Sequence, residues 1–185
     1  IIAVTGSNGK TTTATLIYHI LKSAGLNVGL AGNVGVSFAS SVCDYSYDYY
    51  VLEVSSFQLD HSITFKPNIS VITNISPDHL DRYDEDFDLY TLSKYSIVKN
   101  QKPNDFFIYN NDCIVTKKIF SRVQIKSKSI SFSTKQNSGL KHSIYANNKN
   151  IISSINKEKF MLSTDKIQIK GCLLYTSPSP RDLWI

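Results

Sequence analysis

The residues with the clearest chemical potential lie in one loop near the start of the chain, TGSNGKTTT, which runs from Thr5 to Thr13. Gly6 and Gly9 allow the backbone to turn tightly, so that successive N–H groups point into one concavity. Lys10 adds a full positive charge at the end of the loop, and Thr11 offers a hydroxyl that can ligate a magnesium ion shared with nucleotide phosphates. These residue types in this order predict a loop that binds phosphate.

The segments on either side of the loop are those that a phosphate site requires. Residues 1–4 form a short apolar run typical of a buried parallel strand, and a helical pattern follows over residues 11–24 and ends at Gly25. The strict pattern G-x-x-x-x-G-K-[ST] is not met, because Val4 occupies the position of the first glycine. The alternative is an ordinary Gly/Asn turn with a solvated lysine, but the order strand, loop, helix favours phosphate binding.

Further polar residues follow two of the other strand patterns. Asn33, between glycines in GNVG, carries a donor and an acceptor, and a ligand contact and a simple turn explain it equally well. Glu53 lies in an otherwise apolar strand, where a carboxylate is costly unless a positive partner accompanies it. Magnesium and a buried salt bridge would both serve, and the phosphate loop in the same sheet favours magnesium. Ser55 and Gln58, at the end of this strand, suit the binding of a polar substrate.

His79 and Lys94 are harder to assign from spacing. His79 stands in the acid-rich loop SPDHLDRYDED, on the face where we expect Glu53, so a metal ligand is at least as well supported as a structural histidine. The acids of residues 84–88 are better explained as charges at the start of the next helix than as catalysts. Lys94, in LYTLSKYSIV, has an ordinary surface lysine as its default interpretation.

The order of patterns along the chain predicts an α/β domain. Strand-like runs alternate with helical runs through the first 120 residues, which indicates a parallel sheet with helices on both faces. Further strand patterns lie at residues 26–32, 49–55, 67–76 and 105–110, and a helical pattern at 87–100. Ligands of such sheets gather at the carboxyl ends of the strands, where the polar candidates also fall.

From about residue 129 the pattern changes to short alternating runs: SISFS, HSIYANN, NIISSI, KFMLS and KIQIK. These runs predict a small antiparallel β extension of the sheet. We expect one incomplete domain over residues 1–171. The last segment, CLLYTSPSPRDLWI (172–185), breaks the pattern and resembles translated sequencing-adaptor sequence, so we expect a non-native tail; a disordered native tail is the alternative.

Charge and cysteine usage exclude several classes of protein. The net charge is +5, but residues 1–110 carry seven Lys/Arg against eleven Asp/Glu, and residues 111–185 carry thirteen against four. Because the basic excess lies in the half without the loop, we expect a solvated surface and no nucleic-acid groove. No run is long and apolar enough for a membrane span. Three widely spaced cysteines without a CxxC pair indicate reduced thiols in a cytoplasmic protein.

Taken together, TGSNGKTT, GNVG, LEVSSFQLD and PDHLDRY resemble the central domain of the Mur ligases, the ATP-dependent amide-bond ligases of peptidoglycan synthesis. The phosphate loop of that family, TGTNGKT/S, also lacks the first glycine. The resemblance is strongest to the branch that adds D-glutamate to UDP-N-acetylmuramoyl-L-alanine, because other branches differ in the run EVSSFQ, residues 53–58. It is dense over residues 1–112, weak over 113–171 and absent from 172.

The resemblance implies a role for each matching position. ATP and Mg²⁺ are the implied cofactors, and UDP-N-acetylmuramoyl-L-alanine and D-glutamate are the implied substrates of a monomeric enzyme in the bacterial cytoplasm. The positions that would contact ATP are Gly6, Ser7, Asn8, Gly9, Lys10, Thr11 and Thr12. The catalytic positions are Lys10, Lys94 and His79. The positions that would contact the muramoyl-alanine substrate are Asn33, Ser55 and Gln58.

The metal ligands come from the same resemblance. Thr11 and Glu53 would hold one magnesium ion, and His79 a second. Lys94 would be carbamylated, and this modification turns a cation into an anion compatible with a metal site. The family continues after a Lys-Gly pair with His-Asn-x-x-Asn, whereas Cys172 and Leu173 follow Gly171 here.

Three alternatives stay open. The chain could come from another Mur or folylpolyglutamate synthase-type ligase, although SSFQ and GNVG count against this. It could be a module that binds Mg-ATP without catalysis. A nucleic-acid-binding protein is the weakest alternative, because the first half is acidic. The resemblance also implies further domains, for the uridine nucleotide and for the incoming amino acid, so we expect this 185-residue chain to ligate nothing alone.

Overall fold

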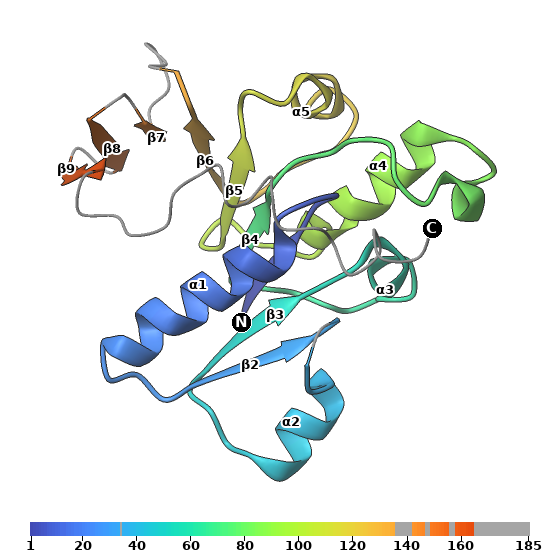
Figure 1. Cartoon of the computed structure of the whole chain (residues 1–185). Helices are drawn as coiled ribbons and strands as arrows, with labels where there is room; N and C mark the ends of the chain where they lie inside the picture. The colour runs from blue at the N-terminus through green and yellow to red at the C-terminus, as the bar shows by residue number, and fades with distance from the viewer. Residues whose placement is uncertain (34, 136–141, 147–148, 156–157, 165–185) are drawn as a thin grey trace, which may run out of the picture.

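The computed structural model describes residues 1–33, 35–135, 142–146, 149–155 and 158–164. Within these ranges the chain forms one sheet of nine strands, in the spatial order β2-β3-β1-β4-β5-β6-β7-β8-β9 (Figure 1). The strands are β1 (Ile2–Thr5), β2 (Val28–Gly32), β3 (Tyr49–Glu53), β4 (Ile69–Ile72), β5 (Phe106–Asn110), β6 (Lys128–Ser133), β7 (Ser143–Ala146), β8 (Asn150–Ile155) and β9 (Glu158–Ser163). The predicted strand KIQIK and the expected tail lie outside the described residues.

The sheet is parallel from β2 through to β7, and β1 lies between β3 and β4 near its centre. Val4 of β1 is in register with Glu53 of β3 on one side and with Val71 of β4 on the other. The carboxyl ends of parallel strands meet at one edge, so the segments that follow β1, β2, β3 and β4 are brought together there. The predicted α/β fold is confirmed.

Helices cover both faces of the sheet. On one face α1 (Lys10–Ser23) packs on β1, β2 and β3, and its residues Ala14, Ile17 and Leu21 join a cluster with Val4 and Val51. The other face is covered by α3 (Ser56–Asp60), α4 (Phe87–Tyr95) and α5 (Ile114–Ile119), which contribute to the larger core cluster. Because successive strand residues point to opposite faces, Ala3 belongs to the second cluster while Val4 belongs to the first.

The helices begin and end where their sequences provide caps. After α1, Gly25 adopts φ +80; its N–H bonds to Lys22 O, and the N–H of Leu26 bonds to Leu21 O, which is a Schellman motif. Asp86 caps α4 by accepting the N–H groups of Asp88 and Leu89, so for Asp86 the helix-capping interpretation is confirmed. The sequence patterns did not predict α3, α5, α2 (Phe38–Asp44) or the short 3₁₀ helix η1 (Leu80–Tyr83), whereas the 3₁₀ helix η2 (Ser96–Val98) falls inside the helical pattern predicted over residues 87–100.

The antiparallel extension is smaller than predicted. β7 pairs antiparallel with β8, and β8 with β9, as expected for the runs NIISSI and KFMLS. The run SISFS in β6 is parallel to both of its neighbours, so the antiparallel prediction was wrong for that run. The reason is α5, which the pattern did not reveal: it makes the connection from β5 to β6 a helical crossover, and crossovers join parallel strands.

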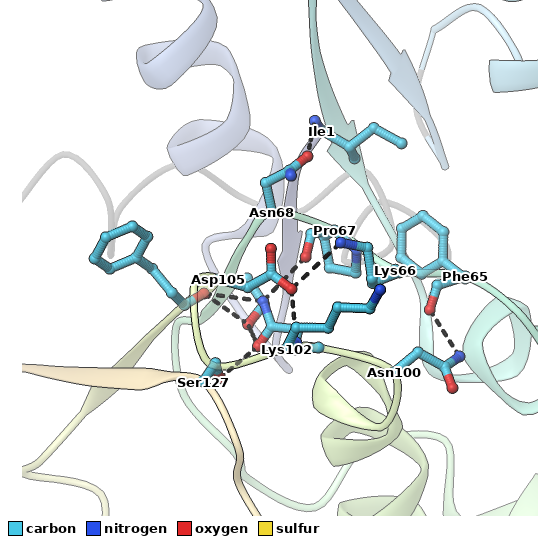
Figure 2. A network of polar contacts seen from close by, with 12 residues as sticks. Ile1, Phe65, Lys66, Pro67, Asn68, Asn100, Lys102, Asp105 and Ser127 are labelled. Carbon is cyan, nitrogen blue, oxygen red and sulfur yellow. Dashed lines mark hydrogen bonds and ion pairs between the residues drawn. The ribbon is translucent and has the colours of Figure 1, made fainter.

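A buried polar network holds the opposite end of the sheet, away from the strand carboxyl ends (Figure 2). The Gln101 side chain, 2 % exposed, accepts hydrogen bonds from the hydroxyls of Ser70 and Ser127 and donates to two backbone carbonyls. Beside it, buried Asp105 pairs with Lys66 at 3.4 Å. Because each of these polar groups has partners, the network is best explained as structural.

Among the described residues, no helix has both the length and the apolar character that crossing a membrane would require.

Candidate functional site

The predicted phosphate loop, residues 6–9, joins β1 to α1 at the carboxyl edge of the sheet. Gly6 has φ +145, and a Cβ atom added there would lie 2.0 Å from the Thr73 hydroxyl of the neighbouring segment. Only glycine allows this approach. Val4, which replaces the usual first glycine, is a fully buried strand residue beneath α1. The tight turn that this loop needs therefore falls at Gly6, two residues later.

The Lys10 ammonium lies at the loop itself. Its Nζ donates to the carbonyls of Gly6 at 3.0 Å and Ser7 at 2.8 Å. Lys10 is also the first residue of α1, whose first N–H groups have no acceptor within the helix. A full charge and a helix N-terminus therefore combine at one point, as the sequence predicted for an anion site.

Lys94 reaches the same loop from α4 on the other face. Its Nζ donates to the Gly6 carbonyl at 2.9 Å and lies 4.5 Å from the centre of the Tyr90 ring. The residue is only 3 % exposed, so its default interpretation as a surface lysine was wrong. The helical pattern showed that Lys94 belongs to a helix, but it could not show that this face of α4 packs on the phosphate loop.

Glu53 links Thr11 and Asn33. Its carboxylate accepts the Thr11 hydroxyl at 2.7 Å and the Asn33 amide at 3.0 Å. Gly32, where β2 ends, makes this possible, because a Cβ added there would lie 2.2 Å from the Glu53 carbonyl. The N–H of Asn33 donates to that same carbonyl. Three residues predicted separately from the sequence thus form one hydrogen-bonded group at the start of α1.

The Glu53 group fits a hard divalent cation. Glu53 is 3 % exposed, and among the described residues its side chain has only neutral hydrogen-bond donors and no ion pair. A buried carboxylate of this kind is unfavourable without positive charge, and carboxylate, hydroxyl and amide oxygens are the ligands that Mg²⁺ prefers. No cluster of three His, Cys, Asp or Glu residues that could hold a metal occurs in the described ranges.

His79 follows β4 and stands at the start of η1 with a left-handed backbone, φ 52. Its ring meets Phe57 of α3 edge-on at 6.5 Å, and its Nε2 lies 3.7 Å from the Asp78 carboxylate. These contacts place the ring beside α3. The second metal position, at His79, stays a prediction.

Ser55 and Gln58 have a structural role that the sequence analysis did not include. Ser55 caps α3, its hydroxyl accepts the Gln58 N–H, and the Gln58 side-chain oxygen accepts the Ser55 N–H at 2.8 Å. This is a capping box, whose S-x-x-Q signature is visible in SSFQ. The box fixes both side chains at the carboxyl end of β3, and the predicted substrate contact would have to be made from that position.

The residues that hold the loop from outside were not predicted from the sequence. Thr73 and Asn74 follow β4 and bond to the backbone of Asn8, and the Ser7 hydroxyl bonds to the Ser76 carbonyl at 2.8 Å and meets the Tyr90 hydroxyl at 2.9 Å. The N–H groups of Ser7 and Asn8 are both bonded to Asn74 here. One signal was available: polar residues directly after a central strand of a parallel sheet lie beside the loop of the adjacent strand.

The strand, the glycine-bounded loop with its lysine and the helix that follows define a nucleotide-type phosphate-loop domain of the α/β class. Comparison with known families agrees with that geometry. The chain belongs to the Mur ligase family, since residues 4–174 match the family's middle domain.

Individual relatives support the same family. The chain is 42% identical over 171 residues to a UDP-N-acetylmuramoylalanine–D-glutamate ligase of Christiangramia forsetii. The matched region covers 92% of this chain and 38% of that protein. It is 51% identical over 138 residues to the ligase of the same name from Bacteroides fragilis, covering 75% of this chain and 31% of the relative. The chain therefore spans less than two-fifths of the length of these relatives.

The fold has counterparts among solved structures. The MurF ligase from Thermotoga maritima, in complex with ADP, superposes with a TM-score of 0.63 at 22% identity, over 88% of this chain and 39% of that one. At this level of identity the similarity establishes the fold, a mostly parallel sheet with helices on both faces, and nothing more specific.

Proposed function

We propose that this chain is the ATP- and magnesium-binding core of a ligase that joins D-glutamate to UDP-N-acetylmuramoyl-L-alanine. The observation that carries the proposal is the hydrogen-bonded group of Thr11, Glu53 and Asn33 at the start of α1. Lys10 and the buried Lys94 both donate to the Gly6 carbonyl of the loop that precedes α1. The names of the relatives support the choice of substrates. A monomeric enzyme of the bacterial cytoplasm is part of the same proposal.

Each residue has a definite task in this reaction. The substrate carboxylate would attack the γ-phosphate of ATP to give an acyl phosphate, and the amine of D-glutamate would then displace phosphate to form the amide. Lys10 would neutralise charge on the phosphoryl group during its transfer, while residues 6–9 and the start of α1 orient the phosphates. Asn33, Ser55 and Gln58, at the ends of β2 and β3, would position the muramoyl-alanine end.

Magnesium would be held by Glu53 and Thr11, with His79 at a second position. When bound, it supplies Lewis-acid charge neutralisation to the phosphate oxygens. Asn33 would keep the Glu53 carboxylate aimed at that position, because its amide donates to one carboxylate oxygen while the Thr11 hydroxyl donates to the other.

Lys94 is proposed to carry a carbamate. The nitrogens of Lys94 and Lys10 both bond to the Gly6 carbonyl, so they lie within about 6 Å of each other, and Lys94 is 3 % exposed. In its neutral form the lysine amine attacks CO₂; the new N–C bond gives a carbamate, and one proton leaves.

The modification can be tested by NMR on the intact protein, meaning this chain together with the further domains that the resemblance implies. In ¹³C-bicarbonate it should show a carbamate carbon resonance, and this resonance should vanish in Lys94→Arg. A spectrum without it in the wild type would refute the modification.

A ligation assay with a panel of substrates tests the function. The intact protein, supplied with Mg-ATP and UDP-N-acetylmuramoyl-L-alanine, should release phosphate and form product with D-glutamate and not with L-glutamate or a diamino acid. Preference for a different nucleotide-linked acceptor or a different amine would assign the protein to another branch of the family. ATP binding without any ligation by the intact protein would favour the non-catalytic module.

The same ligation assay can be run on the isolated 185-residue chain and compared with the intact protein. It spans 38% of the Christiangramia forsetii relative, and we expect it to form no product. Measurable ligation by the isolated chain would contradict the proposal that further domains supply the uridine-nucleotide and amino-acid sites.

A further inference from the structure

Asn74, the second residue after β4, bonds to the phosphate loop through three separate groups. Its side-chain oxygen accepts the N–H of Asn8 at 3.0 Å, and its side-chain nitrogen donates to the carbonyl of the same residue at 3.0 Å. Its backbone carbonyl accepts the N–H of Ser7 at 2.9 Å. One asparagine thus holds both polar backbone groups of Asn8 and one of Ser7.

Asn8, whose backbone the Asn74 side chain holds, has little else to fix its backbone conformation, whereas Ser7 is also held through its hydroxyl. Asn8 is exposed to solvent, so no hydrophobic packing anchors it, and the glycines at positions 6 and 9 give the backbone around it wide conformational freedom. The Thr73 hydroxyl adds one more hydrogen bond, to the Asn8 carbonyl at 2.6 Å. The segment after β4 is therefore a brace for the outer side of the loop.

We propose that Asn74 is a positioning residue that keeps the phosphate loop in its nucleotide-binding shape before nucleotide arrives. The proposal rests on the proposed function, because it assumes that this loop binds nucleotide. If the loop is already ordered in the folded protein, nucleotide binding does not have to offset the loss of the loop's conformational entropy, and the affinity is higher. Asn74 itself acts through the backbone of Ser7 and Asn8 and needs no contact with the nucleotide.

The variant Asn74→Ala removes both side-chain bonds, and Asn100→Ala is its matched control. The Asn100 side chain also holds a loop by two bonds, to the carbonyls of Ile63 at 2.9 Å and Phe65 at 3.0 Å. It does so in the network at the other end of the sheet (Figure 2). Asn74→Asp is a second variant of nearly the same size: it can still accept the Asn8 N–H but cannot donate to the Asn8 carbonyl.

Two measurements on the intact protein separate this proposal from the proposed function. The first is amide hydrogen exchange of the peptide that covers the loop, without nucleotide. We expect exchange at Ser7 and Asn8 to become at least about tenfold faster in Asn74→Ala, faster to a smaller degree in Asn74→Asp, and unchanged in Asn100→Ala. The second is titration with Mg-ADP, where Kd should rise about tenfold in Asn74→Ala, rise less in Asn74→Asp and stay unchanged in Asn100→Ala. In Asn74→Ala, kcat at saturating ATP should be reduced less than kcat/KM for ATP.

Each outcome decides a separate point. Loop exchange at the wild-type rate in Asn74→Ala would overturn the positioning role, and so would equal acceleration in Asn100→Ala, which would indicate general loosening. Faster loop exchange with an unchanged Kd for Mg-ADP would also overturn it, because the order would then not serve binding. If the wild type itself bound no nucleotide, the proposed function would fail, while the exchange rates would still show whether Asn74 holds the loop.

Discussion

Replacing Lys10 by alanine in the intact protein should lower kcat/KM for ligation on the order of 10³-fold while the protein stays folded. The ammonium lies on the Gly6 and Ser7 carbonyls at the point where strand, loop and helix converge. Its charge would be needed most when the phosphoryl group is transferred. Its loss leaves the Gly6 carbonyl bonded to Lys94, so the loop keeps an internal partner there.

Lys22→Ala is the matched control for this prediction. Lys22 lies in the last turn of the same helix, and its ammonium bonds to the Tyr18 hydroxyl at 2.9 Å, far along α1 from the loop. It should ligate at the wild-type rate. Steady-state phosphate release and the thermal midpoint Tm, measured for both variants, separate chemistry from stability. Wild-type ligation by Lys10→Ala would remove Lys10 from the proposed mechanism.

Lys10→Arg refines the interpretation. It keeps the positive charge but replaces a compact ammonium with a planar guanidinium, which cannot occupy the same position between two carbonyls. We expect intermediate activity. Activity equal to that of the wild type would show that charge alone is required at this position and that geometry contributes little.

The sequence predicted those parts of the molecule that depend on local pattern. Apolar runs bounded by turns located β1 to β5, and Gly6, Gly9 and Lys10 located the phosphate loop, because each of these features needs only neighbouring residues. Glu53 could also be singled out, since a carboxylate inside an apolar run is conspicuous without any structure. Its hydrogen bonds to Thr11 and Asn33 were not predicted from the pattern: the pairing with Thr11 came only from the family resemblance, and Asn33 was expected to contact the substrate.

The parts that sequence could not predict depend on contacts between distant segments. Lys94 is 88 residues from Gly6 along the chain, and nothing in the pattern around it distinguishes a buried lysine from an exposed one. Asn74 is 66 residues from Asn8. The helix α5 has only six residues, too few to show a helical period, and missing it led to the wrong direction for β6.

Glu53→Gln should separate magnesium binding from folding. The amide has the same shape and can still accept the Thr11 hydroxyl, and the Asn33 amide can turn to suit it, so the free energy of unfolding should change by no more than about 1 kcal/mol. Ligation should nevertheless fall about 10²–10³-fold, because a neutral amide cannot balance a divalent cation. The magnesium concentration for half-maximal activity should rise as well.

Asp105→Asn is the comparison for Glu53→Gln, because Asp105 is also a buried carboxylate but should contribute to stability and not to activity. Asp105 pairs with Lys66 at the far end of the sheet, and its removal leaves that ammonium without its carboxylate partner (Figure 2). We expect this variant to lose about 1–2 kcal/mol of stability and to keep its activity and its magnesium dependence. The two buried acids are thus distinguished by their partners: Asp105 has a lysine within the fold, whereas Glu53 has neutral donors, which leaves its charge available for a cation. If Glu53→Gln lost stability and kept its magnesium dependence, Glu53 would be a structural acid and the metal site would have to lie elsewhere.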